Sequence, residues 1–304
     1  MIIRSDRTMD SGTANLIETL SERVIELANE DKWDEAMQAA EAAVEKARAS
    51  DSGEFDDVVR LAATLEIKAD LLRQQSFLED ARVIYLEALE MLNGKSECTE
   101  MLARVCASIG VLYDFVENDE EAILYYERAI EMYERLDPPE LEEVADICNN
   151  LGFIYRSIGN MDTAETLFLK GLEICHNSYG KNHEKTAILF NNVGALYLKS
   201  GYDEQAREMH TMALEGRIAS LGENHPDTAQ SYSNLALSLA QMGENKQAKE
   251  YFVKSLAVFA DHVDTAPHDY AAVAENYAEF LRSVEDDKGS AKVMKKAQKK
   301  LARV

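Results

Sequence analysis

The sequence predicts an all-α fold, a solenoid of about seven helix pairs stacked in a single elongated domain. Three segments align without gaps, at 149–168, 191–210 and 233–252, so the repeat is 42 residues long. The alternation of polar and apolar residues that marks a strand appears nowhere. Only 4 prolines and 14 glycines occur in 304 residues, of which 46% are hydrophobic and 29% charged. This composition suits a helix-rich protein with a large core, and the repeat indicates helix pairs that bury their apolar faces only against neighbouring pairs.

Each predicted pair carries two small residues at fixed places. One lies in the middle of the first helix, at Ala69, Gly110, Gly152, Gly194, Ala236 and Ala278. The other opens the second helix, at Ala36, Ala81, Ala122, Ala164, Ala206 and Ala248. In the first pair, Val24 stands at the position that a small residue occupies in the first helix of the other pairs. Small side chains let two helices approach closely. We expect the aromatic residues four places after the alanines, such as Tyr126 and Phe168, to fill the space between neighbouring pairs.

Glycine and proline mark the ends of the predicted helices. First helices are expected to end in a left-handed turn at Gly159, Gly201 and Gly243, and second helices at Gly180 and Gly222. A proline in the first turn suits the helix that begins at Pro226. These signals place the helix pairs near residues 14–47, 55–92, 98–136, 140–178, 182–220, 225–260 and 268–304. Residues 1–13 are expected to form a flexible N-terminal tail.

The repeated pattern of a small residue, a tyrosine three places later, a glycine, an alanine and an aromatic residue resembles the tetratricopeptide repeat. The 42-residue period and two segments are similar to the kinesin light chain subtype, which has a longer second helix and a G-x-x-H-P-D linker. The segments are YGKNHEKTAILFNNVGALYLKSG (179–201) and LGENHPDTAQSYSNLALSLAQMG (221–243). The resemblance covers roughly residues 55–282. It implies a right-handed superhelical solenoid with the first helices on its concave side.

Within this family, the subunits of kinesin motors carry a heptad-repeat coiled coil before their repeats. The first pair is expected to begin by about residue 14, which leaves no room for such a segment, so we expect no motor-subunit role. The chain is more similar to the short bacterial members, among them the type associated with bacterial tubulins. That resemblance implies a scaffold that binds and stabilises a tubulin-like, microtubule-like filament.

Asparagines recur on the predicted concave face. Those two places before the small residue are Asn150, Asn192, Asn234 and Asn276, and Asn149 and Asn191 precede two of them. In the tetratricopeptide family, amides on this face bind the backbone of an extended peptide, since an amide both donates and accepts. Alternatively, they bond neighbouring helices or only follow the repeat consensus. The binding interpretation predicts that Asn192→Ala with Asn234→Ala abolishes binding and leaves helicity and melting unchanged.

Charges on the same face are mixed. The bases are Arg73, Arg104, Arg156, Lys199 and Arg282, and the acids are Glu66, Asp70, Asp114, Asp146, Glu275 and Glu279. Kinesin light chains that capture acidic cargo peptides use a strongly basic groove, so this mixture argues against acidic-peptide capture and favours docking on a folded partner. The predicted groove contacts are the six asparagines together with Arg156, Lys199 and Arg282.

The C-terminal segment is basic. Between Ser290 and Val304 there are no acids and six bases: Lys292, Lys295, Lys296, Lys299, Lys300 and Arg303. An apolar seam at helical spacing lies beneath them, at Val293, Ala297, Leu301 and Val304. One interpretation is a terminal helix docked by this seam, with lysines favouring the helix C-terminus. The other is a contact with an acidic protein surface, such as that of tubulin, or with anionic lipid.

Composition and motifs exclude several classes of function. Acidic residues outnumber basic ones by 56 to 32, and the net charge of −24 argues against nucleic-acid binding. No secretory signal and no membrane-spanning apolar run is present. The cysteines Cys98, Cys106, Cys148 and Cys175 form no C-x-x-C pair, so we expect reduced, mostly buried thiols in a cytoplasmic protein.

No motif for catalysis is present. His183-Glu184 lacks the second histidine of a zinc-protease helix, and there is no phosphate-binding loop or nucleophile turn. We expect His183 and His225 to cap helices and His210 to pack at an aromatic core position. We therefore expect no enzyme, cofactor, metal site or small-molecule substrate. Three functions stay open: a filament-binding scaffold, a regulator or adaptor that grips an extended partner segment, and a membrane adaptor that uses the basic C-terminal helix.

Overall fold

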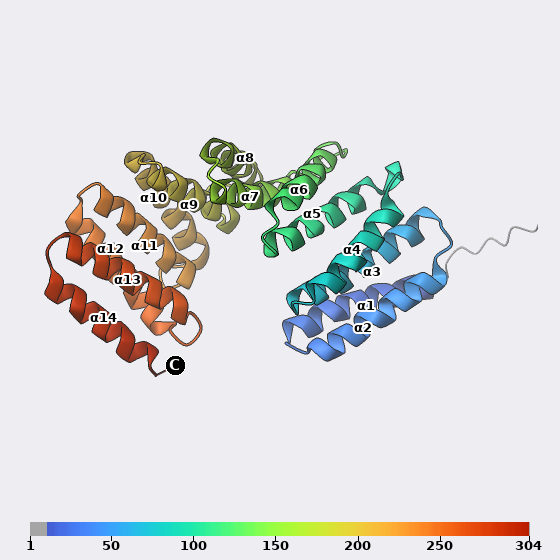
Figure 1. Cartoon of the computed structure of the whole chain (residues 1–304), viewed down its shortest axis with the longest axis horizontal. Coiled ribbons are helices and arrows are strands. Elements are labelled where there is room, and N and C mark those ends of the chain that lie inside the picture. Colours follow the sequence, from blue (N-terminus) through green and yellow to red (C-terminus); the bar gives the residue numbers. More distant parts are fainter. Residues whose placement is uncertain (1–10, 304) are drawn as a thin grey trace, which may run out of the picture. The chain divides into compact units, whose positions relative to one another are not determined.

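The computed structural model describes residues 11–303 (Figure 1). These residues form fourteen α-helices and one short 3-10 helix, and they contain no strand. The elements are α1 (Ser11–Asn29), α2 (Trp33–Ser50), α3 (Phe55–Gln74), α4 (Leu78–Leu92), η1 (Ser96–Cys98), α5 (Thr99–Phe115), α6 (Asp119–Glu134), α7 (Leu141–Ser157), α8 (Met161–Tyr179), α9 (Glu184–Lys199), α10 (Asp203–Leu221), α11 (Pro226–Gln241), α12 (Asn245–Asp261), α13 (Pro267–Ser283) and α14 (Asp287–Leu301). The predicted all-α class with seven helix pairs is confirmed. Helix α1 begins at Ser11 rather than near residue 14, and the rest of the expected N-terminal tail lies outside the described residues.

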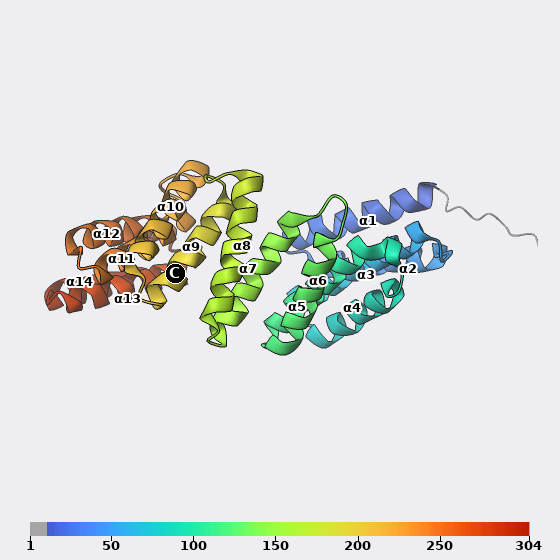
Figure 2. The same cartoon turned by 90° about the horizontal axis from the view of Figure 1, so that it is seen from above.

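The chain divides into two compact units, unit 1 (Met1–Ile147) and unit 2 (Cys148–Val304). In unit 1, α1 packs on α2, α3 on α4 and α5 on α6, and α2 and α4 also contact the first helix of the next pair. In unit 2 the pairs α9–α10, α11–α12 and α13–α14 pack in the same way, as both views show (Figures 1 and 2). The single continuous domain with the expected pair boundaries stays a prediction.

The predicted close approach within a pair occurs at the small residue of the first helix in the three pairs where that residue is glycine. A Cβ atom added to Gly110 would lie 2.6 Å from the ring of Tyr126, and one added to Gly152 would lie 2.5 Å from the ring of Phe168. Tyr126 and Phe168 are 1% and 0% exposed. The ring of one helix therefore lies directly on the backbone of its partner.

Other core positions agree with the pattern. Val24, which replaces the small residue in the first pair, is buried in a cluster with Leu27 and Leu71. The centre of the Phe252 ring lies 5.3 Å from that of Tyr277 in the next pair, so this ring does fill space between pairs. Tyr126 and Phe168, for which the sequence predicts the same role, instead lie against the first helix of their own pair. All four cysteines are buried, and none forms a disulfide. None of the described helices is long and apolar enough to cross a membrane.

Each first helix ends on a residue with positive φ. The predicted left-handed turns at Gly159, Gly201 and Gly243 are confirmed, with φ of 85°, 79° and 78°. The other four pairs place a residue other than glycine at this position: Asp31, Ser76, Glu117 and Glu285, with φ between 57° and 64°. In all seven pairs the next backbone N–H donates to the carbonyl five residues earlier, at 2.8–2.9 Å. This Schellman bond satisfies a carbonyl that the helix end would leave unpaired.

His210 packs where other pairs place an aromatic ring, as predicted. It is 1% exposed, and a Cβ added to Gly194 would meet its imidazole at 2.5 Å. Its Nδ1 lies 2.8 Å from Oγ of Ser238. Burial lowers the pKa of His210 to about 4. The folded protein therefore holds this imidazole neutral at neutral pH.

We expect Gly152→Ala to lower the free energy of unfolding by about 1–3 kcal/mol, because the new methyl group forces the Phe168 ring away. The sign of this change is diagnostic, because replacing glycine by alanine in a helix without such a contact would raise the stability by about 1 kcal/mol. Urea unfolding followed by circular dichroism measures the effect. Phe168→Leu in the same background should recover part of the loss. An increase in stability would show that the two helices do not depend on this close contact.

His210 should make the fold sensitive to acid. Between the ordinary histidine pKa of 6.5 and the folded value of about 4, the unfolded chain binds a proton that the folded protein does not. Its contribution to stability is therefore full above pH 6.5 and is lost as the pH falls through this window, by up to about 1.4 kcal/mol per pH unit. We expect His210→Phe, which supplies the ring found at Phe168, to lessen this loss in urea unfolding at neutral and mildly acidic pH. The exposed His268, changed to glutamine, is the control, and an unchanged pH dependence in His210→Phe would contradict the prediction.

Candidate functional site

The first helices of successive pairs contact one another within each unit. The contacts join α1, α3 and α5 in unit 1, and α9, α11 and α13 in unit 2. In each unit, we call the surface that its own first helices present the first-helix face of that unit. These faces carry the residues that the sequence predicts as groove contacts.

Hydrogen bonds between amides join three first helices in unit 2. Nδ2 of Asn192 in α9 donates to Oδ1 of Asn149 in α7 at 2.7 Å, and Nδ2 of Asn234 in α11 donates to Oδ1 of Asn191 in α9 at 2.6 Å. Asn191 and Asn192 are only 9% and 8% exposed. The alternative in which the amides bond neighbouring helices therefore describes four of the six asparagines. Peptide binding by their other polar atoms stays a prediction.

The two amide bonds share one register. The donor lies two residues before the small residue of its own helix. The acceptor lies on the preceding first helix, three residues before the small residue of that helix. Ser108 and Glu66 occupy these two positions in unit 1, and Ser108 Oγ donates to Glu66 Oε1 at 2.9 Å. The bond is thus a repeated polar link between successive first helices, and it does not require asparagine.

The other predicted groove residues lie in different surroundings. Asn150 and Asn276 are half-buried, and Lys199 is exposed. The Arg156 guanidinium lies 4.9 Å from the centre of the Phe153 ring. Arg282 is exposed, and its Nη1 donates to Ser290 Oγ at 3.3 Å. The structure pairs Asn149 with Asn192 and Asn191 with Asn234.

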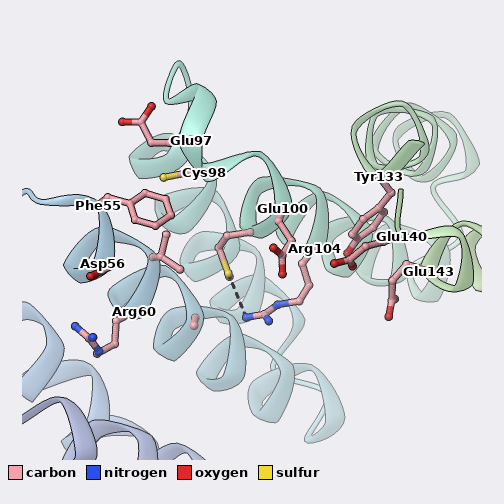
Figure 3. A pocket seen from close by; sticks show the side chains of 13 residues that line it. Phe55, Asp56, Arg60, Glu97, Cys98, Glu100, Arg104, Tyr133, Glu140 and Glu143 are labelled. Atoms are coloured by element: carbon pink, nitrogen blue, oxygen red, sulfur yellow. Dashed lines mark hydrogen bonds between the residues drawn. The ribbon is translucent and has the colours of Figure 1, made fainter. Parts of the chain in front are cut away.

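A cavity of about 500 Å³ lies in unit 1 between α3, α5, the end of α6 and the start of α7 (Figure 3). Phe55, Val59 and Met101 supply apolar wall, and Tyr133 closes one side. The acidic lining residues are Asp56, Glu97, Glu100, Glu140 and Glu143, and the basic ones are Arg60 and Arg104.

Of the residues that line this cavity, sequence reasoning placed only Arg104 on the predicted binding face, and it named Cys98 only as a buried thiol. The signal that could have found the others is again the register of the repeat. Arg60, Met101 and Glu143 each lie nine places before the small residue of their own helix, so stacking the pairs brings them to one place.

Both bases of the cavity are paired with carboxylates buried beneath it. Arg104 Nε donates to Glu66 Oε2 at 2.7 Å, and Arg60 Nη1 lies 3.0 Å from Asp57 Oδ1. Glu66 and Asp57 are each 5% exposed. Burial raises the pKa of Glu66, and the charge of Arg104 opposes that rise. These pairs leave the acidic lining residues as the unbalanced charges of the cavity. Three of them, Glu100, Glu140 and Glu143, form what we call its rim.

The basic C-terminal helix is docked by its apolar seam, as one interpretation predicts. Ala297 of α14 is buried, with Val293 and Leu301 packed against the same core cluster; Val304 lies outside the described residues. Lys300 and Arg303 line a shallow hollow together with Asp261 and Asp264. The remaining bases, Lys292, Lys295, Lys296 and Lys299, are exposed.

The linker histidines cap helices, as predicted. Nδ1 of His183 accepts the backbone N–H of Lys185 at 3.3 Å, and Nδ1 of His225 accepts that of Asp227 at 3.2 Å. Among the described residues there is no group of three or more His, Cys, Asp or Glu side chains that could hold a metal ion.

Asn149 and Asn192 should be coupled in stability. We expect each alanine substitution to lower the free energy of unfolding by about 1–2 kcal/mol, because the partner amide is left partly buried without its bond. The double variant should lose less than the sum, by about 1 kcal/mol. Asn149→Ala with Asn234→Ala is the control pair, since these two amides do not bond each other, and its effects should add. Equal additivity in both pairs would contradict the link.

Asn192 and Asn234 each donate one of these amide bonds. Asn192→Ala with Asn234→Ala is therefore expected to lower the melting temperature, whereas the sequence-based expectation was that melting would stay unchanged.

Two family models of the tetratricopeptide repeat match the chain. One matches residues 143–219 and 203–261, and the other matches residues 103–135. Together the matches span half of the chain. No curated protein matches it.

Solved structures share the fold. BtubC (BKLC) from P. vanneervenii is 25% identical, over 76% of this chain and 92% of that chain, with a TM-score of 0.68. A putative kinesin light chain from Podosopora anserina with nearly identical TPR-like repeats is 16% identical, over 68% of this chain and 97% of that chain, with a TM-score of 0.58. The apo form of RapI is 15% identical, over 95% of this chain and 77% of that chain, with a TM-score of 0.74. With its seven helix pairs and matched repeats, the chain belongs to the tetratricopeptide-repeat family.

Proposed function

We propose that this protein is a protein-binding scaffold of the kinesin light chain type, without enzymatic activity, that binds and stabilises a bacterial tubulin filament. The likeness to BtubC carries the proposal, because it extends over 92% of that chain at 25% identity. A match of this length covers an ordered series of repeats rather than one common motif. The short bacterial kinesin light chains that the sequence resembles supply the filament as the partner.

The charge distribution supports docking on a folded, acidic partner. Lys292, Lys295, Lys296 and Lys299 point away from the docked seam of α14 and are exposed. Tubulin presents an acidic surface, so these lysines are suited to it. By contrast, Arg60 and Arg104 on the first-helix face of unit 1 are paired with buried carboxylates, so that part of the face offers few unpaired bases to an acidic peptide.

We expect the protein to pellet with preformed bacterial tubulin filaments, in proportion to polymer and less at high salt, since exposed charge pairs are screened. Lys295→Glu with Lys299→Glu should reduce the pelleted fraction several-fold. Lys46→Glu with Lys181→Glu, at exposed positions outside α14, changes the net charge equally and should pellet as the unmodified protein does. Co-sedimentation of the three proteins at two salt concentrations makes the measurement.

The outcomes separate the two parts of the proposal. If the unmodified protein fails to pellet, filament binding is wrong. If both charge variants pellet equally, the filament is bound by another surface, such as Lys199, Arg282 and the asparagines of the first-helix face of unit 2. The same lysines also suit anionic lipid. Flotation of the protein with anionic vesicles but no pelleting with filaments would favour the membrane-adaptor function.

A regulator or adaptor that grips an extended partner segment is a second candidate. The unit 1 cavity favours it, because a hollow of about 500 Å³ with apolar walls and polar side chains is typical of a binding site.

A further inference from the structure

We infer that the unit 1 cavity binds the side chain of a lysine or arginine in an extended segment of a protein partner. This inference goes beyond filament binding and does not depend on it. It rests on three features of the cavity: the charge of its rim, one unpartnered hydroxyl group, and its apolar walls.

The carboxylates of the rim have no cationic partner among the described residues. Neither Glu100, Glu140 nor Glu143 forms an ion pair among the described residues, and the two arginines of the cavity are committed to Asp57 and Glu66. Burial, together with the charges of Glu100 and Glu143, raises the pKa of Glu140. Three carboxylates that line one cavity favour a cation between them, because the cation would offset their mutual repulsion.

Tyr133 supplies an independent indication of a ligand. Its side chain is 2% exposed, yet its hydroxyl group has no hydrogen-bond partner in the described part of the chain. Figure 3 shows Tyr133 beside Glu140, on the side of the cavity that faces Glu100. Burial raises the pKa of Tyr133, so the phenol stays protonated. A phenol oxygen in this place can accept a hydrogen bond from an ammonium or guanidinium group.

The apolar walls suit the stem of such a side chain. Phe55, Val59 and Met101 line the cavity near its acidic groups. Lysine and arginine combine an aliphatic stem with a charged head, so they bury the first against apolar surface and keep the second near acids. A second hollow of about 310 Å³ between α1 and α3 shares Arg60 and Ala63 with the cavity. An extended segment could therefore continue from one hollow to the other along the first-helix face of unit 1.

Two other ligands fit less well. A metal ion is disfavoured, because the described residues hold no group of three or more side chains placed to ligate one. An acidic peptide would meet five carboxylates and two arginines that are already paired. The cavity thus selects a cationic group that has an apolar stem.

The methyl group of Met101 is a local reporter, since Met101 lines the cavity. The experiment titrates the full chain, labelled with ¹³C at its methionine methyl groups, with the blocked peptide Gly-Ser-Arg-Ser-Gly to millimolar concentration. The Met101 signal is assigned through Met101→Leu. Matched peptides carry Gln or Glu in place of Arg, and spermidine is a further probe. We expect the Arg peptide to shift the Met101 signal with at least about tenfold higher affinity than the Gln peptide, as charge-assisted hydrogen bonds predict.

Variants test whether the rim is responsible. Glu140→Gln with Glu143→Gln should weaken binding of the Arg peptide about tenfold, and Tyr133→Phe should weaken it without a change in net charge. Glu250→Gln with Glu279→Gln, at exposed positions in unit 2, removes the same charge as the rim variant and should have no effect. The inference is overturned if the Arg and Gln peptides bind equally or not at all, or if the rim and control variants behave alike. Equal affinity for spermidine would also overturn it, because a free polyamine would then be the ligand in place of a partner segment.

Discussion

The contact between a small residue of the first helix and a ring of the second helix, seen at Gly110, Gly152 and Gly194, is the packing feature from which the rest of this structure follows. At Gly152 the backbone of α7 lies against the Phe168 ring with no room for a methyl group. This contact fixes how the two helices of a pair are rotated about their own axes. Once that rotation is fixed, the same side chains of every first helix point toward the next pair. The register of the polar links between first helices therefore follows from a packing constraint inside each pair.

The sequence was sufficient to predict the fold because the relevant signals are local or periodic. The small residues, the rings four places after the alanines and the glycine turns each occur at a fixed step, and each has a direct steric reason. Other features escaped prediction. Asp31, Ser76, Glu117 and Glu285 adopt the left-handed turn without glycine, because the Schellman bond and the packing of the pair impose that conformation. Residue type alone gives no signal there.

The candidate site was predicted less well. The asparagine row was recognised, but its 42-residue step does not tell which asparagines meet. Asn192 bonds Asn149, and Asn234 bonds Asn191, so the contacts join positions that differ by one place. Successive helices are offset along their axes, and sequence alignment does not contain that offset. The cavity was missed for a related reason: Glu100, Tyr133 and Glu143 come from three helices, and Tyr133 belongs to a second helix rather than to a first one.

The way in which charge is neutralised explains why this face does not act as a basic groove. Arg60 and Arg104 are on the first-helix face of unit 1, but each is bound to a carboxylate that is 5% exposed. Removing such an arginine would leave a buried charge unpaired, which costs several kcal/mol, so these arginines are structural first, and their charge is already balanced by the protein's own acids. The acids of the rim do not neutralise a buried charge, and neither do the exposed lysines of α14. The two proposed partners therefore use different residues, the acidic lining of the cavity in unit 1 and the exposed lysines of α14 in unit 2.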